Sequence, residues 1–127
     1  MKTKKTKFNN KNEMFFLTFK QKDDKIDFTI NCQTNFSDLY YGKEFSLNDL
    51  QKISKYFSLF DSIDECFIDF KQKFNDNNYE MILNENNSKI TLKSKTNIAN
   101  KDFNIEIPIK KREQETIYCK FIFPNFI

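Results

Sequence analysis

The chain has 127 residues, enough for about one domain, and carries a net charge of +3. It contains no His, no Trp and a single glycine, Gly42, which argues against imidazole catalysis and glycine-rich phosphate loops. No apolar run approaches the roughly 20 residues that a membrane-spanning helix requires. Codons for the abundant Phe, Ile, Asn and Lys are A/T-rich, which indicates an A/T-rich genome and makes lysine content by itself weak evidence of function.

The positive charge is concentrated at the N-terminus. Residues 1–12 hold five lysines and no acid: Lys2, Lys4, Lys5, Lys7 and Lys11. Subtracting these five charges from +3 leaves −2 for residues 13–127. We therefore predict a basic, disordered tail over residues 1–12 and a single globular domain over residues 13–127. The N-terminal segment does not read as a signal peptide, so the expected location is cytoplasmic or nuclear.

The first predicted elements are strands. Every second residue is apolar over residues 14–20 and again over residues 25–32, which is the period of a strand. The polar residues between the two segments are typical of a hairpin loop. Residues 38–44 are ambiguous, because Leu39, Tyr40 and Tyr41 could form a short strand that ends at Gly42.

Two helix start signals follow. Ser46 precedes Asp49 by three residues, and Ser62 precedes Glu65 in the same way, which is the spacing of an N-terminal cap. Apolar residues then recur at helical spacing after each start. The stripes are Leu47, Leu50, Ile53 and Phe57 in the first segment, and Ile63, Cys66, Phe67, Phe70 and Phe74 in the second. These segments predict a helical hairpin.

Four further strands are predicted over residues 79–85, 89–96, 103–110 and 116–123. Together the elements indicate one α+β domain, an antiparallel sheet or sandwich of about six strands with the helical hairpin inserted midway. The expected order is β-β-α-α-β-β-β-β.

The sequence offers no constellation for catalysis or metal binding. Cys32, Cys66 and Cys119 are widely spaced and each falls on an apolar face, which favours three buried, reduced side chains. The acidic residues cluster near the predicted start of the second helix, where negative charge stabilises a helix. They are Asp61, Asp64, Glu65 and Asp69. We predict no catalytic residue, no metal, no cofactor and no small-molecule substrate.

Nucleic-acid binding is the alternative function. Lys89, Lys93 and Lys95 share one face of a predicted strand, and Lys110, Lys111 and Arg112 end the next strand. With the basic tail, these side chains could form a surface that follows phosphates or meets an acidic partner. The aromatic side chains that stack on single-stranded bases are mostly at inward positions here.

Protein–protein contact is the function that we predict first, and the C-terminus suggests where it occurs. Tyr118 and Ile122 point away from the inward face of the last predicted strand, and Phe126 and Ile127 lie beyond that strand. Either the terminal pair folds back onto the core, or it forms an exposed apolar patch that binds a partner.

The segment Glu44-Phe45-Ser46-Leu47-Asn48-Asp49-Leu50, followed by Phe57–Phe74, resembles a known arrangement. Strands, a helix–turn–helix and further strands are similar to the globular head domains shared by the centriolar cartwheel scaffold protein and the DNA end-joining scaffold proteins. Those heads are non-enzymatic and assemble through head–head contacts. Their long heptad stalk has no counterpart after Lys110. The resemblance implies a non-enzymatic interaction or scaffold subunit of a larger assembly, with protein partners.

Overall fold

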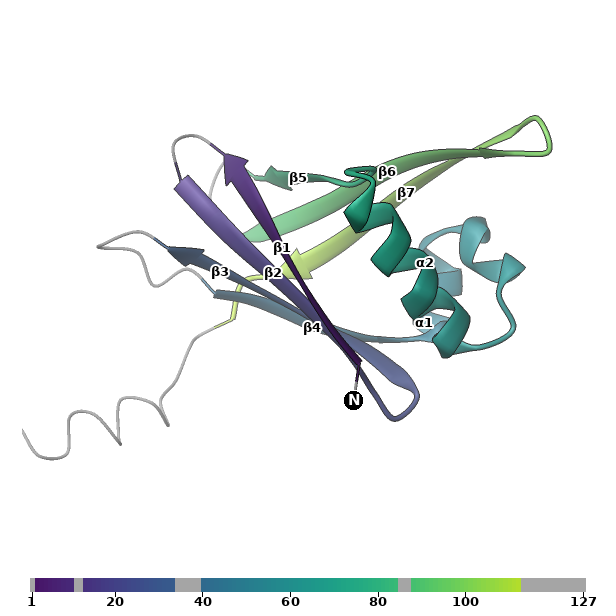
Figure 1. The fold of residues 1–127 in the computed structure, drawn as a ribbon, viewed down its shortest axis with the longest axis horizontal. Coiled ribbons are helices and arrows are strands. Elements are labelled where there is room, and N and C mark those ends of the chain that lie inside the picture. The colour runs from purple at the N-terminus through teal and green to yellow at the C-terminus, as the bar shows by residue number, and fades with distance from the viewer. Residues whose placement is uncertain (1, 11–12, 34–39, 85–87, 113–127) are drawn as a thin grey trace, which may run out of the picture.

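The computed structural model describes residues 2–10, 13–33, 40–84 and 88–112, with backbone alone for 2–10, 13 and 32–33. Its strands form two antiparallel sheets (Figure 1). The first sheet has the order β1-β2-β3-β4, and its strands are β1 (Lys2–Asn10), β2 (Glu13–Lys22), β3 (Lys25–Gln33) and β4 (Tyr40–Ser46). The second has the order β5-β6-β7, with β5 (Glu80–Leu83), β6 (Lys89–Ile98) and β7 (Lys101–Lys110).

The helical segments lie between the two sheets in chain order. They are α1 (Leu47–Ile53), the 3₁₀ helix η1 (Lys55–Leu59) and α2 (Ile63–Asn75). This arrangement confirms the predicted class, an α+β domain of antiparallel strands with helices inserted midway.

Both predicted helix starts are confirmed by their hydrogen bonds. Ser46 Oγ accepts from the Asp49 N–H at 3.1 Å, and Asp49 Oδ2 accepts from the Ser46 N–H at 3.0 Å. Ser62 Oγ accepts from the Glu65 N–H at 3.3 Å at the start of α2. These caps satisfy amides that the first helical turn leaves unpaired. The first helix is shorter than its apolar stripe suggested, because Ser54 is extended and itself caps η1.

The two sheets approach each other at two places. The end of β7 lies beside β4, where Lys111 forms an isolated antiparallel bridge with Tyr41 and the Arg112 N–H donates to the Tyr40 carbonyl at 2.7 Å. Gly42 leaves room for this crossing, since a Cβ there would lie 3.2 Å from Arg112 Cδ. On the opposite side, β1 lies next to β5. The sheets therefore enclose one shared interior.

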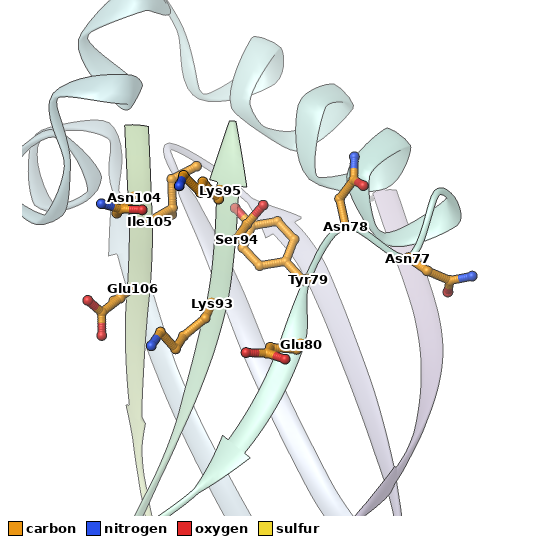
Figure 2. A pocket seen from close by; sticks show the side chains of 10 residues that line it. All are labelled: Asn77, Asn78, Tyr79, Glu80, Lys93, Ser94, Lys95, Asn104, Ile105 and Glu106. Atoms are coloured by element: carbon orange, nitrogen blue, oxygen red, sulfur yellow. The ribbon is translucent and has the colours of Figure 1, made fainter. Parts of the chain in front are cut away.

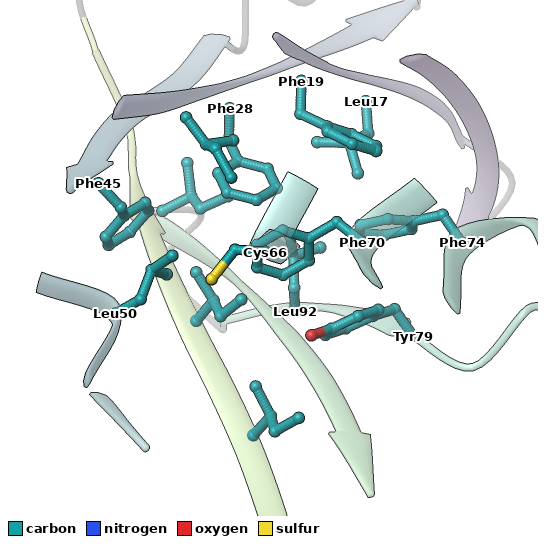
Figure 3. Packing of buried hydrophobic residues seen from close by; sticks show 14 of the residues in the cluster. Leu17, Phe19, Phe28, Phe45, Leu50, Cys66, Phe70, Phe74, Tyr79 and Leu92 are labelled. Carbon is teal, nitrogen blue, oxygen red and sulfur yellow. The ribbon is translucent and has the colours of Figure 1, made fainter. Parts of the chain in front are cut away.

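Aromatic side chains fill that interior. Phe70 of α2 packs against Phe28 of β3 with ring centroids 5.2 Å apart and against Phe57 of η1 at 5.6 Å. It also lies 5.9 Å from the ring of Tyr79, which precedes β5. Leu92 of β6 belongs to the same buried cluster (Figure 3). One face of α2 thus contributes to a core that both sheets share.

The N-terminal segment differs from its prediction as a disordered tail. Residues Lys2–Asn10 form β1, which pairs antiparallel with β2 from Lys2 opposite Gln21 to Asn10 opposite Glu13. A strand at the edge of a sheet needs an apolar pattern less than a central strand does, and lysine is common there because it discourages pairing with other chains. The lysine-rich composition of residues 2–10 therefore gave no sign of the strand that they form.

Two other strand predictions need correction. The ambiguous segment over residues 38–44 contains β4, which continues past Gly42 to Ser46. The strand predicted over residues 79–85 is observed as the shorter β5, Glu80–Leu83, which lies at the edge of its sheet and leaves Ile82 39% exposed. The strand predicted over residues 116–123 lies outside the described residues. In the described part of the chain, four strands precede the helical segments and three follow them.

Replacing Phe70 by Ala should lower the free energy of unfolding by about 3–5 kcal/mol, because it leaves a large cavity among rings from both sheets. Urea denaturation followed by circular dichroism measures this difference. Ile68→Ala on the same helix is the matched control: Ile68 is 58% exposed, so its truncation should change stability by no more than about 0.5 kcal/mol. Equal effects of the two substitutions would contradict this position of α2.

Candidate interaction surface

The β6–β7 hairpin extends beyond the rest of its sheet. β5 pairs with β6 only from Lys93 to Ile90, whereas β6 and β7 remain paired as far as Ile98 opposite Lys101. Figure 1 shows this hairpin projecting past the helices. Ala99 and Asn100 form its two-residue turn with φ values of 52° and 64°, as tight hairpin turns require. The tip is therefore a well-defined projection.

The inner part of the hairpin is held by the helical segments. The ring of Phe103 on β7 lies 5.8 Å from that of Tyr56 in η1. Lys73 of α2 donates from Nζ to Thr96 Oγ1 on β6 at 2.9 Å, and the same ammonium lies 5.2 Å from the centre of the Tyr56 ring. Lys73 is almost fully buried, so these contacts replace water around its charge.

Asp69 supplies the acidic member of this cluster. The Tyr56 hydroxyl donates to Asp69 Oδ1 at 2.8 Å. Burial raises the pKa of Asp69 above its usual range, although the Tyr56 hydrogen bond and the charge of Lys73 act in the opposite direction. Burial, followed by the charge of Asp69, also raises the pKa of the Cys66 thiol to about 12. Cys66 is therefore a protonated, buried packing residue, as predicted, and not a nucleophile.

Beyond this cluster, the tip of the hairpin is exposed from Asn97 to Asp102. Asn97 Nδ2 donates to Asp102 Oδ1 at 2.8 Å and so links the two strands. Ile98 lies between these residues and the turn, and it is 39% exposed. An exposed branched apolar side chain on a supported projection is a suitable contact point for another protein.

The structure divides the predicted basic strand face. Lys93 pairs with Glu80 on one side and Glu106 on the other, so two acids flank it across the sheet. Lys95 stands opposite Asn104. Lys89 pairs with Lys110, and these two form a basic end to the face. The three lysines of β6 are thus not one continuous phosphate-binding row.

The remaining basic candidates are dispersed. Lys111 forms the bridge to β4, and the side chain of Arg112 lies over Gly42. Lys2, Lys4, Lys5 and Lys7 belong to β1, in the other sheet. The backbone of these four residues is paired with β2 and does not form a free tail.

Several predicted features lie outside the described side chains. These are the C-terminal partner candidates Tyr118, Ile122, Phe126 and Ile127, and two of the cysteines, Cys32 and Cys119. Of the acidic residues at the start of α2, Glu65 accepts from the Asp61 N–H at 2.6 Å, which is a helix-capping role. Across the described part of the chain, no cluster of three or more His, Cys, Asp or Glu side chains could hold a metal ion.

The hairpin tip was not among the residues singled out from sequence. The sequence places strands over residues 89–96 and 103–110, and Asn100 between them is a common turn residue. The sequence does not indicate that β5 is short. Because β5 pairs with β6 only between Ile90 and Lys93, no third strand lies beside the outer part of the hairpin in the described part of the chain.

Replacing Asp69 by Asn should stabilise the protein at pH 7. Because burial raises the folded-state pKa of Asp69, its contribution to stability is complete when the carboxyl is protonated and is lost as pH rises through that raised pKa. Asn resembles the protonated acid and can still accept from Tyr56. The stability gained by the variant should therefore shrink toward zero below pH 4, as measured by urea denaturation at several pH values. A gain independent of pH would contradict this assignment.

The comparisons with known proteins concern the fold. No family model matches the sequence, and a search of curated proteins gives no match. Among solved structures, the chain is similar to the head domain of human CCDC61, with a TM-score of 0.66 and 6% sequence identity. The likeness covers 91% of this chain and 100% of the other. Within the described residues, no helix is long and apolar enough to cross a membrane. The protein has a fold similar to that of a head domain.

Proposed function

We propose that this chain is a non-enzymatic scaffold domain that self-associates through the tip of the β6–β7 hairpin. The likeness to a head domain supports this proposal at the level of fold. The resemblance noted in the sequence adds that heads of the cartwheel and end-joining scaffold proteins assemble through head–head contacts. A cytoplasmic or nuclear location and an absence of enzymatic activity belong to the same proposal.

The projecting hairpin is the observation that carries the proposal. A two-stranded hairpin is marginal by itself in water, yet this one is anchored below its tip, where Tyr56 packs on Phe103 and Lys73 donates to Thr96 opposite it. Anchoring lowers the conformational entropy that binding must remove from the tip. Ile98 can therefore present its apolar surface to a second copy without first becoming ordered.

The C-terminal candidates are a second part of the proposal. Tyr118, Ile122, Phe126 and Ile127 would contact a further protein if they lie on the surface. The chain leaves the described region at Arg112, beside Tyr40 on β4, which is the opposite end of β7 from the hairpin tip.

Replacing Ile98 by Asp should abolish self-association while leaving the domain folded. A charge at the centre of an apolar contact must lose its hydration on binding, which should weaken dimerisation by 100-fold or more. Analytical ultracentrifugation of the full chain over a concentration series measures the dissociation constant, and circular dichroism reports the fold.

Ile82→Asp is the matched control, because Ile82 is also 39% exposed and belongs to the same sheet, but lies on β5 away from the tip. Self-association should survive this change. A wild-type chain that remains monomeric at every concentration, or a dimer that tolerates Asp at position 98, would refute the proposal.

A further inference from the structure

The first sheet carries an apolar patch on the face that points away from the core. Phe15, Leu17 and Phe19 of β2 are fully buried in the core, so the alternation of a strand places Met14 and Phe16 on the opposite, outer face. Both side chains are half-buried there. An antiparallel strand whose outer face meets only water carries polar residues at such positions. The apolar pair therefore indicates a surface that another segment covers.

The patch continues across the sheet to β4. Phe16 stands opposite Asn31 of β3, and Asn31 stands opposite Tyr40 of β4. Tyr40 is half-buried, and it lies on the outer face because the next residue, Tyr41, is fully buried in the core. With strands about 4.8 Å apart, the backbone of Tyr40 lies roughly 10 Å from that of Phe16. We call Met14, Phe16 and Tyr40 the outer patch.

The chain arrives at the outer patch with Arg112. The Arg112 N–H donates to the Tyr40 carbonyl at 2.7 Å, and the Arg112 side chain lies over Gly42, with Cδ 3.2 Å from the place of a Cβ there. Gly42 has the orientation of Tyr40, two residues before it, so this side chain lies on the outer face. Burial raises the pKa of Asp27, on the same face of β3, and the charge of Arg112 acts against that shift. The residues after Arg112 therefore continue from the outer face of the first sheet.

The sequence that follows Arg112 suits this patch. The strand predicted over residues 116–123 lies outside the described residues, but its pattern separates two faces. One face is wholly apolar: Ile117, Cys119, Phe121 and Phe123. The other is mixed: Thr116, Tyr118, Lys120 and Ile122. An extended chain advances about 3.3 Å per residue, so roughly four residues after Arg112 are enough to cross from Tyr40 to Phe16. The predicted strand begins at that distance, with Thr116.

Two other surfaces fit such a segment less well. An open cavity of about 600 Å³ lies at the base of the β6–β7 hairpin (Figure 2). Its lining is mostly polar or charged, and Figure 2 shows Glu80, Lys93 and Glu106 among the residues around it. Ile82 is exposed on the outer face of the second sheet, but the Arg112 side chain lies on the first sheet. The outer patch combines apolar side chains with the point where the chain leaves the described residues.

We propose that residues 116–123 of this chain dock in extended form on the outer patch, with their wholly apolar face against the sheet. The docked segment covers Met14 and Phe16 and leaves Tyr118 and Ile122 facing outward, as the proposed C-terminal contact with a further protein needs. The inference goes beyond the proposed function, because it requires neither a partner nor self-association through Ile98.

The test measures how well the segment protects the outer patch in the full chain. Met14→Cys introduces a thiol there, and Ile98→Asp in every variant removes the contact proposed at the hairpin tip. Alkylation of position 14 by iodoacetamide is followed by mass spectrometry of its peptide. Adding Phe121→Asp should speed this alkylation by about tenfold or more, because a charge on the apolar face opposes docking. Ile122→Asp is the matched control: it places the same charge on the mixed face, which stays in water, so the rate should change by less than about twofold.

Cross-linking then identifies what covers the patch. A short bismaleimide should join position 14 of the Met14→Cys variant to Cys119 of the same chain. Ile82→Cys is the reference, because Ile82 lies on the outer face of the second sheet; its link to Cys119 should form at about a tenth of that rate or less, since docking raises the effective concentration of Cys119 at the patch alone. Cys66 does not interfere, because its thiol is fully buried and burial raises its pKa to about 12.

The inference is overturned if Phe121→Asp leaves the alkylation rate of position 14 unchanged, or if Cys119 links equally to both positions. Links between two chains would show that a second copy covers the patch, which also overturns it. If circular dichroism shows that Met14→Cys is unfolded, Thr18→Cys on the same face of β2 replaces it. A wild-type chain that never self-associates would refute the proposed function and leave this inference standing, since every variant here already carries Ile98→Asp.

Discussion

The aromatic face of α2 is the element on which the rest of this structure depends. Phe70 and Phe74 contact rings from the first sheet, from η1 and from the segment that begins the second sheet. A small sheet has one apolar face that must be covered, and neither sheet here covers the other without the helix. Placing α2 inside the shared core therefore fixes the positions of both sheets, and with them the direction of the β6–β7 hairpin.

The same helix carries a polar cluster on its side facing the hairpin. Asp69 and Lys73, one turn apart, contact Tyr56 and Thr96 and do not simply form a surface ion pair. Burying these charges costs stability, as the raised pKa of Asp69 indicates. What the cluster provides is orientation, since directional hydrogen bonds fix the hairpin against the helices more specifically than apolar packing does. The proposed self-association through the hairpin tip requires such fixed geometry.

The edge strands of the two sheets differ in sequence and in length. β1 lies at one edge and is rich in lysine, which keeps that edge from pairing with other chains. β6 has no neighbouring strand on one side beyond Lys93 in the described part of the chain, where β5 gives way to an open cavity. The two edges therefore differ in how many lysines they carry and in whether a cavity adjoins them.

The sequence by itself determined the class of the fold, because local chemistry encodes it. Alternating residues in β3 and β6 and the caps at Ser46 and Ser62 depend on neighbours within a few positions, and each was confirmed. The strand β1 and the end of β5 were decided by tertiary structure, since edge pairing and strand length depend on which backbone lies alongside. For the same reason the candidate surfaces differ from the basic face predicted from lysine spacing. Register sets Glu80 and Glu106 beside Lys93, and register is a relation between segments far apart in the chain.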